Sequence, residues 1–200
     1  VWIFLKIANS PFYGIPRSVR TLSTAITILG YKSLRNLVLA VSTKAVSKRY
    51  GLVEKMLWEH SVGAALAAYV IAKEIRFPDP EEAFLGGLFH DIGKVILNNG
   101  APEKYGRVIE QVYNEGVTAF FAEKAIFGYS HPDVGALVIK KWQLSEELEY
   151  SIRYHHDFRF LLSGYPYYLG KLAALIHLSD LICLQLGIGR REPSPNLHPE

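Results

Sequence analysis

The chain has 200 residues, of which half are hydrophobic and a fifth are charged. This composition supports a packed core and excludes disorder as the general state. The net charge of +3 is unevenly distributed, because the first 50 residues contain eight Lys or Arg and no Asp or Glu. Polar residues interrupt each apolar run well before the roughly 20 residues that cross a bilayer, so we expect a soluble chain with no membrane partner.

The single cysteine, Cys183, excludes an internal disulfide, and the sequence has no paired-cysteine zinc motif. A reducing compartment therefore fits best, and we expect a cytoplasmic protein. The sequence begins with Val1 inside an apolar stretch, rather than with Met or a signal peptide. We therefore expect it to belong to a longer protein.

The basic first quarter predicts two helices, over residues 22–28 and 34–46, separated by Gly30. Such a pair could be a helix-turn-helix that reads DNA, since its basic side chains would attract phosphate. The alternative is a packing hairpin with solvated basic side chains, which is common in all-α folds. The apolar faces favour packing, and we expect no specific DNA binding.

Helix follows helix from Gly51 onward. Pro78 and Pro80 break the pattern, and Ser130 with Asp133 forms a capping box before another helix. We expect helices over residues 57–75, 81–100, 102–113, 117–127, 131–142, 145–154 and 172–186. No alternating strand pattern persists, so the predicted fold class is all-α. The expected parts are a basic helical module of the same unit, a helical domain and a tail or linker, over residues 1–50, 51–187 and 188–200.

Histidines carry the main chemical signal, because six of the seven lie between His60 and His177. His90 and Asp91 are adjacent in a predicted helix, about 100° apart, and can both lean on one ion. Lys94 projects over the same face. Neutral imidazoles and carboxylates are metal ligands, whereas an ammonium group suits an anionic substrate held on the metal.

Four stretches resemble a known family. LFHDIGK at 88–94, with His60 and Asp180 on other helices, resembles the HD superfamily of metal-dependent phosphohydrolases. Three more are similar to the HDOD branch, the HD-related output domains of bacterial signalling proteins: KIANSPFYGIPRSV at 6–19, AITILGYKSLRNLVLA at 25–40 and SHPDVGALVIKKWQLSEELEYSIRYHHD at 130–157. The resemblance spans nearly the whole chain and implies an HD-like helical bundle.

The resemblance also implies a metal site. The ligands of one ion would be His60, His90, Asp91 and Asp180. The related HD-GYP phosphodiesterases, which cleave cyclic di-GMP, add ligands at the positions of His131, His155 and His156. We expect one or two divalent transition-metal ions, iron, manganese, zinc or nickel. In an enzyme, the catalytic residues would be Asp91 and Lys94.

The sequence departs from the HD-GYP enzymes in two places. Met56 stands where some of them have a Glu, four residues before the first histidine. Gly164, Tyr165 and Pro166 resemble the signature tripeptide, and Asp157 could stand for the acid after the double histidine. The Asp-Gly pair expected between them is missing. These differences affect substrate recognition more than metal binding.

The sequence leaves three functions open. The favoured one is a bacterial signalling output domain with an HD-type metal site, acting through contacts with other signalling proteins or domains. The alternative is an active metal-dependent phosphohydrolase on a cyclic dinucleotide, a nucleotide or another phosphodiester. In that case metal ions would activate a water and Lys94 would stabilise charge on the phosphoryl oxygens. Nucleic-acid binding through the basic hairpin is the third and weakest.

Overall fold

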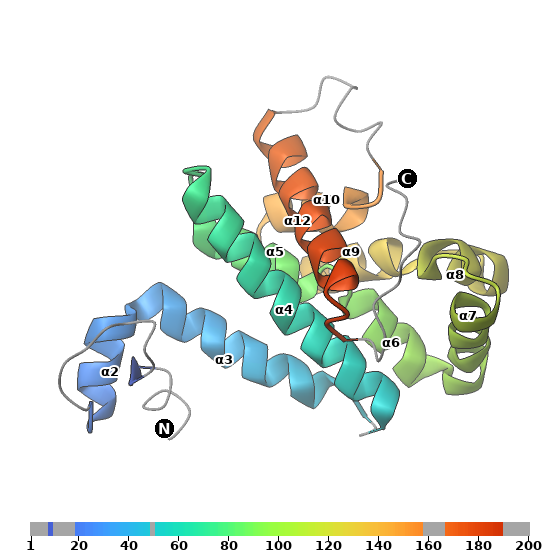
Figure 1. Ribbon diagram of the computed structural model, residues 1–200, viewed down its shortest axis with the longest axis horizontal. Coiled ribbons are helices and arrows are strands. Elements are labelled where there is room, and N and C mark those ends of the chain that lie inside the picture. The colour runs from blue at the N-terminus through green and yellow to red at the C-terminus, as the bar shows by residue number, and fades with distance from the viewer. Residues whose placement is uncertain (1–7, 10–18, 49–50, 158–166, 190–200) are drawn as a thin grey trace. The chain divides into compact units, whose positions relative to one another are not determined.

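A computed structural model describes residues 8–9, 19–48, 51–157 and 167–189 (Figure 1). Helices are the only regular secondary structure in those ranges, which confirms the predicted all-α fold class. The chain divides into two compact units, Val1–Lys44 and Ala45–Glu200. None of the helices in the described ranges combines the length and the hydropathy needed to cross a membrane.

The first unit contains the predicted pair of helices, α2 (Leu22–Leu29) and most of α3 (Tyr31–Val46). Thr21 caps α2, because its hydroxyl accepts a hydrogen bond from the backbone N–H of Thr24 at 3.2 Å. Gly30 ends α2 with a φ of 77°, a conformation that suits glycine. The second helix begins directly after it, earlier than predicted.

The other helices in the described ranges belong to the second unit, and they follow the predicted order with one exception. They are α4 (Leu52–Glu74), α5 (Pro80–Phe89), α6 (Ile92–Gly100), α7 (Pro102–Asn114), α8 (Ala119–Phe127), α9 (His131–Lys141), α10 (Glu146–Tyr154) and α12 (Tyr167–Gln185). α4 begins before the predicted residue 57, because Glu54 accepts a hydrogen bond from the backbone N–H of Gly51 at 2.8 Å and fixes the helix start there. α12 likewise begins before the predicted residue 172.

The exception is the predicted helix over residues 81–100, which is wrong: α5 ends at Phe89 and α6 begins at Ile92. Asp91 leaves helical geometry, with a φ of −99° and a ψ of 8°. Neither proline nor glycine occupies the break, and the apolar pattern continues through it. His90 and Asp91 therefore lie at the junction of two helices, not side by side within one.

Small residues let α4 and α5 pack closely. The buried residues of α4 are His60, Ser61, Ala64, Ala65, Ala68 and Ala72. A Cβ atom added to Gly87 of α5 would lie 2.6 Å from the carbonyl oxygen of Ala64. The two backbones are therefore almost in contact, and the absence of a side chain at Gly87 permits the crossing.

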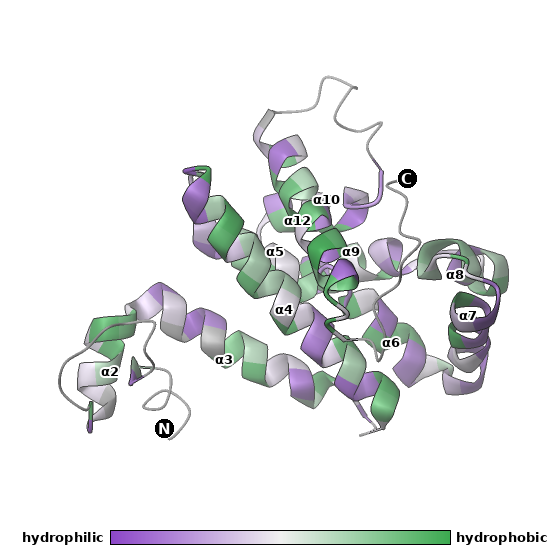
Figure 2. Ribbon diagram, viewed as in Figure 1, coloured by the Kyte–Doolittle hydropathy of each residue, from purple (hydrophilic) through white to green (hydrophobic). Residues whose placement is uncertain are grey.

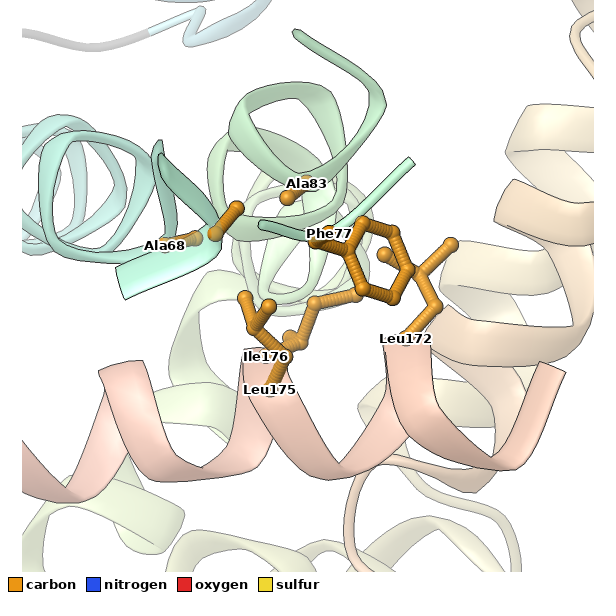
Figure 3. Packing of buried hydrophobic residues seen from close by; sticks show 7 residues of the cluster. Ala68, Phe77, Ala83, Leu172, Leu175 and Ile176 are labelled. Carbon is orange, nitrogen blue, oxygen red and sulfur yellow. The ribbon is translucent and has the colours of Figure 1, made fainter. Parts of the chain in front are cut away.

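α12 packs on both α4 and α5. Figure 3 shows the cluster that joins them, in which Leu172, Leu175 and Ile176 of α12 meet Phe77, Ala68 and Ala83. Figure 2 shows hydrophobic residues around much of α12, as expected of a helix buried on several sides, whereas α7 carries both hydrophilic and hydrophobic residues.

A further set of contacts joins α6, α9 and α10, and α7 pairs with α8. α9 begins with the predicted capping box, in which the backbone N–H and the hydroxyl of Ser130 donate to Asp133 at 3.0 and 2.8 Å. Gly93, near the start of α6, touches the start of α9. A Cβ atom there would overlap the carbonyl oxygen of His131. The helix ends that carry the histidines are thus fixed by backbone contacts.

Candidate metal centre

The predicted metal ligands come together in the second unit, although separate helices supply them. Each is buried except His156, which is partly buried. They are His60 in α4, His90 and Asp91 at the junction of α5 and α6, His131 at the start of α9, His155 and His156 directly after α10, and Asp180 in α12.

Backbone carbonyl groups orient three of the histidines. The Nδ1 atoms of His60, His90 and His155 lie 3.2, 2.8 and 2.7 Å from the carbonyl oxygens of Ile188, Gly87 and Ile152, respectively. A carbonyl oxygen can only accept, so each Nδ1 carries the proton and donates. Nε2 of the neutral ring then keeps its lone pair, which is the arrangement that metal binding requires.

A carboxylate orients His131 instead. Oε2 of Glu123, a fully buried residue of α8, accepts hydrogen bonds from the backbone N–H and from Nδ1 of His131, at 2.6 and 2.7 Å. The hydroxyl of Tyr105 donates to Oε1 of the same carboxylate at 3.5 Å. Glu123 thereby directs Nε2 of His131 into the cluster and makes the ring a stronger ligand.

Asp91 and Asp180 lie between the histidine rings. Oδ1 of Asp180 is 2.9 Å from Nε2 of His60 and 3.7 Å from Nε2 of His90. Oδ2 of Asp91 is 3.4 Å from Nε2 of His90 and 3.7 Å from Nε2 of His60. Oδ1 of Asp91 is 3.3 Å from Nε2 of His131. Asp91 therefore faces two groups of histidines, one through each carboxylate oxygen.

Asp91 does not behave as an ordinary aspartate at a helix start. It is the N-cap residue of α6, where an Asp side chain usually accepts a hydrogen bond from the first turn. Its side chain makes no such bond to α6. The carboxylate is turned toward the histidines and toward Lys94, whose Nζ donates to Oδ2 at 2.7 Å. The break between α5 and α6 thus places Asp91 in the cluster at the expense of a helix cap.

Three sets of residues have ligand atoms within 4.8 Å of one another. They are His60, His90 and Asp91; His131, His155 and His156; and His156, His177 and Asp180. The described part of the chain therefore holds groups able to bind a metal. His177 joins the cluster in addition to the predicted ligands.

The donor atoms fit a transition-metal ion. Nε2 of His90, Nε2 of His155 and Oδ1 of Asp91 are buried, and each lacks a hydrogen-bond partner among the described residues. A buried polar atom without a partner is costly, so these three atoms need a ligand of another kind. Imidazole nitrogens combined with carboxylate oxygens suit iron, manganese, zinc or nickel better than calcium. Metal binding would satisfy the three atoms.

Burial and charge act in opposite directions on the two aspartates. Burial alone would raise the pKa of Asp91, but His90 and Lys94 hold that pKa well below its usual value. Burial would likewise raise the pKa of Asp180, but the neighbouring imidazoles of His60 and His90 hold it well below its usual value. Both carboxylates are therefore charged at neutral pH.

The histidines show two electrostatic behaviours. Burial alone would lower the pKa of His90, but the carboxylates of Asp91 and Asp180 outweigh it and raise the pKa. Burial holds the pKa of His155 well below its usual value, and burial with a neighbouring imidazole lowers the pKa of His156 to about 3. His155 and His156 are therefore neutral at physiological pH, as metal ligands must be.

A pocket of about 300 Å³ opens beside the cluster. His60, Asp91 and Lys94 line it, together with apolar side chains such as Met56 and Ile109. The Lys94 side chain is 17% exposed and is one of the residues that line the pocket. Burial alone would lower the pKa of Lys94, but neighbouring carboxylates, Asp91 first among them, outweigh it and raise that pKa. Lys94 therefore carries its charge at neutral pH.

Some predicted features lie outside the described residues. They are the tripeptide at 164–166, the segment before it at 158–163 and the chain beyond residue 189. Ile188 and Gly189, which belong to the predicted tail, lie against His60, because a Cβ atom on Gly189 would be 2.5 Å from Cβ of His60. Cys183 is buried, and burial raises the pKa of its thiol to about 11.

Glu123 is the functional residue that the sequence does not reveal. Its segment, AFFAEKAIF, has the pattern of an ordinary helix in which Glu123 and Lys124 are surface charges. No motif marks it, because its partner His131 begins the next helix and only the fold brings the two side chains together. The one available signal is the proximity of a Glu to a candidate ligand, eight residues away along the chain.

We expect Glu123→Gln to weaken metal binding by about 10- to 100-fold while the chain still folds. Gln keeps the size of the side chain, but it loses the charge that fixes the proton on Nδ1 of His131. Calorimetric titration of the metal-free protein with Mn²⁺ or Zn²⁺ measures the effect. Glu110→Gln, at an exposed position of α7, is the matched control. Equal metal affinities of the two variants would contradict the role assigned to Glu123.

Comparison with known proteins identifies a family and several similar proteins. Residues 3–158 match the family described as the HDOD domain. A solved HDOD domain protein of unknown function from Geobacter sulfurreducens has a similar structure, with a TM-score of 0.79. It is 29% identical, and the similarity covers 97% of this chain and 65% of that one.

Two curated relatives are more distant. An uncharacterized protein of Treponema pallidum (strain Nichols) is 24% identical, over 76% of this chain and 30% of its own length. Cyclic di-GMP phosphodiesterase PA4108 of Pseudomonas aeruginosa is 27% identical, over 59% of this chain and 26% of its own length. The chain thus spans less than a third of the curated relatives it matches.

Proposed function

Because the chain belongs to the HDOD domain family, we propose that it is a bacterial signalling output domain built around a divalent transition-metal centre. It acts through contacts with other signalling proteins or domains. The short share of each curated relative that it matches supports a domain that works beside other segments. The location proposed with this role is the cytoplasm, in agreement with the single, unpaired cysteine.

The observation that carries the proposal is the convergence of imidazole nitrogens and carboxylate oxygens in one buried cluster. Backbone carbonyls accept hydrogen bonds from Nδ1 of His60, His90 and His155, so that Nε2 of each ring is directed into the cluster. Nε2 of His90, Nε2 of His155 and Oδ1 of Asp91 are buried. None of these three atoms has a hydrogen-bond partner among the described residues. Polar atoms in this state favour a metal over a purely structural network.

The charges of the cluster support the same conclusion. Asp91, Asp180 and Glu123 are buried carboxylates, and Lys94 is the lysine that faces them. Before any histidine is protonated, three negative charges and one positive charge leave a balance of two negative charges. Buried charges are retained where they are paired or bind a metal, and a divalent cation would offset this negative charge.

The residues divide between two metal positions. One ion would be held by His60, His90, Asp91 and Asp180, and a second by His131, His155 and His156 beside the other oxygen of Asp91. When bound, such a metal supplies Lewis acidity and lowers the pKa of a coordinated water. Glu123 keeps His131 in the tautomer that binds, and Lys94 shares the charge of Asp91.

A second function, phosphoester hydrolysis, is favoured by the pocket beside the cluster. A metal centre with a purely structural role does not need a pocket that leads to it. Lys94 presents an ammonium group there, which could bind a phosphoryl oxygen. The relationship to the PA4108 phosphodiesterase points to phosphodiesters. Met56 occupies the position where some HD-GYP enzymes have a Glu. This difference favours the output domain over the hydrolase.

One experiment tests the metal centre and separates the two functions. The purified protein is analysed for bound metal, with and without iron, manganese, zinc and nickel in the growth medium. It is then assayed on cyclic di-GMP and on bis(p-nitrophenyl) phosphate. We expect at least one metal ion per chain and no hydrolysis above background. Substoichiometric metal under every condition would contradict the metal centre.

In an active hydrolase, Lys94→Ala would lower kcat by about 100-fold and leave the metal content nearly unchanged. This follows because Lys94 faces the cluster through Asp91 and is not itself a ligand. Lys55→Ala is the matched control, since Lys55 is exposed in α4 and pairs only loosely with Glu59, at 3.7 Å. Strong, metal-dependent cleavage by the unaltered protein would replace the output domain with an enzyme.

The partners proposed for the chain are proteins and a small ligand. The basic first unit contains α2 and most of α3, and we propose that it contacts protein and reads no specific DNA sequence. No membrane partner is proposed.

A further inference from the structure

The pocket beside the cluster is apolar over most of its surface. Its walls come from the beginning of α4 and from α7, and include Val53, Met56, Ile109 and Val112. Three of these side chains have no polar atom, and the Met thioether is only a weak acceptor. These walls offer few hydrogen-bonding groups to replace the water that a sugar or a nucleobase would lose here. The walls therefore favour an apolar or aromatic group.

The ionisable groups that belong to the buried cluster lie together at one end of the pocket. They are contributed by His60, Asp91 and Lys94. Among the described residues that line the pocket, Lys94 alone carries a permanent positive charge. Tyr105 also lines the pocket, but its hydroxyl donates to Glu123. An anionic group at this end would meet the ammonium of Lys94 and the metal proposed beside it.

The size of the pocket limits the ligand. Its volume of about 300 Å³ lies at the lower end of the range of small-molecule sites. A ligand that reaches the cluster through this space has room for about one ring beyond its anionic group. A cyclic dinucleotide carries two phosphates and two polar bases, and both its size and its polarity fit these walls poorly.

We propose that this pocket binds a small ligand composed of one phosphate-like anionic group and one apolar or aromatic group. The anionic group lies at Lys94 and the metal centre, and the apolar group lies against Met56 and Ile109. The inference rests on the proposed metal centre and adds to it the class of ligand. The ligand would be the signal that an output domain senses, or the substrate if the domain is a hydrolase.

Two phosphonates that resist hydrolysis test the proposal. Phenylphosphonate and methylphosphonate carry the same anionic group and differ in apolar surface. Calorimetric titration of the metal-loaded protein should show phenylphosphonate binding at least about tenfold more tightly, because the ring is buried against the wall. Cyclic di-GMP, titrated under the same conditions, should bind more weakly than phenylphosphonate.

Variants of the wall locate the binding. Met56→Gln and Ile109→Gln, both at partly buried positions, should reduce the preference for the phenyl group below about threefold and leave methylphosphonate binding unchanged. Leu66→Gln is the control, because Leu66 is 55% exposed on α4 and does not line the pocket. Lys94→Gln should weaken both phosphonates by a similar factor.

The outcomes separate this inference from the metal centre. Equal affinity of the unaltered protein for the two phosphonates would overturn it, and so would tighter binding of cyclic di-GMP. Elemental analysis of the same sample tests the metal centre independently. Metal present without selectivity contradicts the ligand class alone, whereas absent metal contradicts the proposed function.

Discussion

Asp91→Ala is expected to leave less than about a tenth of the wild-type metal bound to the purified protein. Asp91 faces His60 and His90 through one carboxylate oxygen and His131 through the other, so no other side chain of the cluster replaces it. Its loss also removes the partner of Lys94. Elemental analysis measures the metal content of the variant. The thermal midpoint with and without added metal measures how far its stability still depends on the metal.

Free metal at about 100 times its dissociation constant should stabilise the unaltered protein by about 2.7 kcal/mol and should leave Asp91→Ala unchanged. Asp91→Asn keeps the shape of the side chain and serves where the Ala variant does not fold. Glu59→Gln is the control, because Glu59 precedes His60 yet is 45% exposed. A full complement of metal in both Asp91 variants would rule out the centre.

Gly93→Ala is expected to lower the free energy of unfolding by about 3 kcal/mol or more, or to prevent folding. The added Cβ would overlap the carbonyl oxygen of His131, and a backbone atom cannot turn away as a flexible side chain can. α6 and α9 must therefore separate. Because Asp91 is the N-cap residue of α6 and His131 begins α9, the same shift would also move these two residues apart.

Gly106→Ala provides the comparison within a neighbouring helix. Gly106 lies inside α7 with no described atom within 4 Å of an added Cβ, so this variant should gain about 0.5–1 kcal/mol from the better helix propensity of Ala. Urea denaturation of both variants gives the two free energies. A Gly93→Ala protein as stable as Gly106→Ala would show that the contact between α6 and α9 is not rigid.

The fold was largely predictable from the sequence because its signals are local. Gly30 ends α2, and Ser130 with Asp133 begins α9. The break between α5 and α6 was not predictable in this way. Asp91 leaves the helix where neither glycine nor proline requires it, since the gain lies in contacts with His60 and His131 on other helices. The local sequence pattern does not indicate these contacts between helices.

The candidate site was predictable only in part for the same reason. The resemblance to a family indicated the ligand positions, and the structure brings their side chains together. It did not indicate Glu123, which no ligand motif contains, nor the role of Ile188, a residue of the predicted tail whose carbonyl oxygen orients His60. Such supporting contacts form only through tertiary packing between residues that are distant in the sequence, so a sequence pattern does not reveal them.

The contact between His60 and Asp180 joins residues that are 120 positions apart, at 2.9 Å. A ribosome releases the chain from its N-terminus, so the first histidine emerges long before the last aspartate. Closing so long a loop costs conformational entropy, and the packing of α12 on α4 and α5 offsets that cost. A complete set of ligands therefore does not exist on the nascent chain. Metal binding that needs Asp180 would therefore follow synthesis of α12.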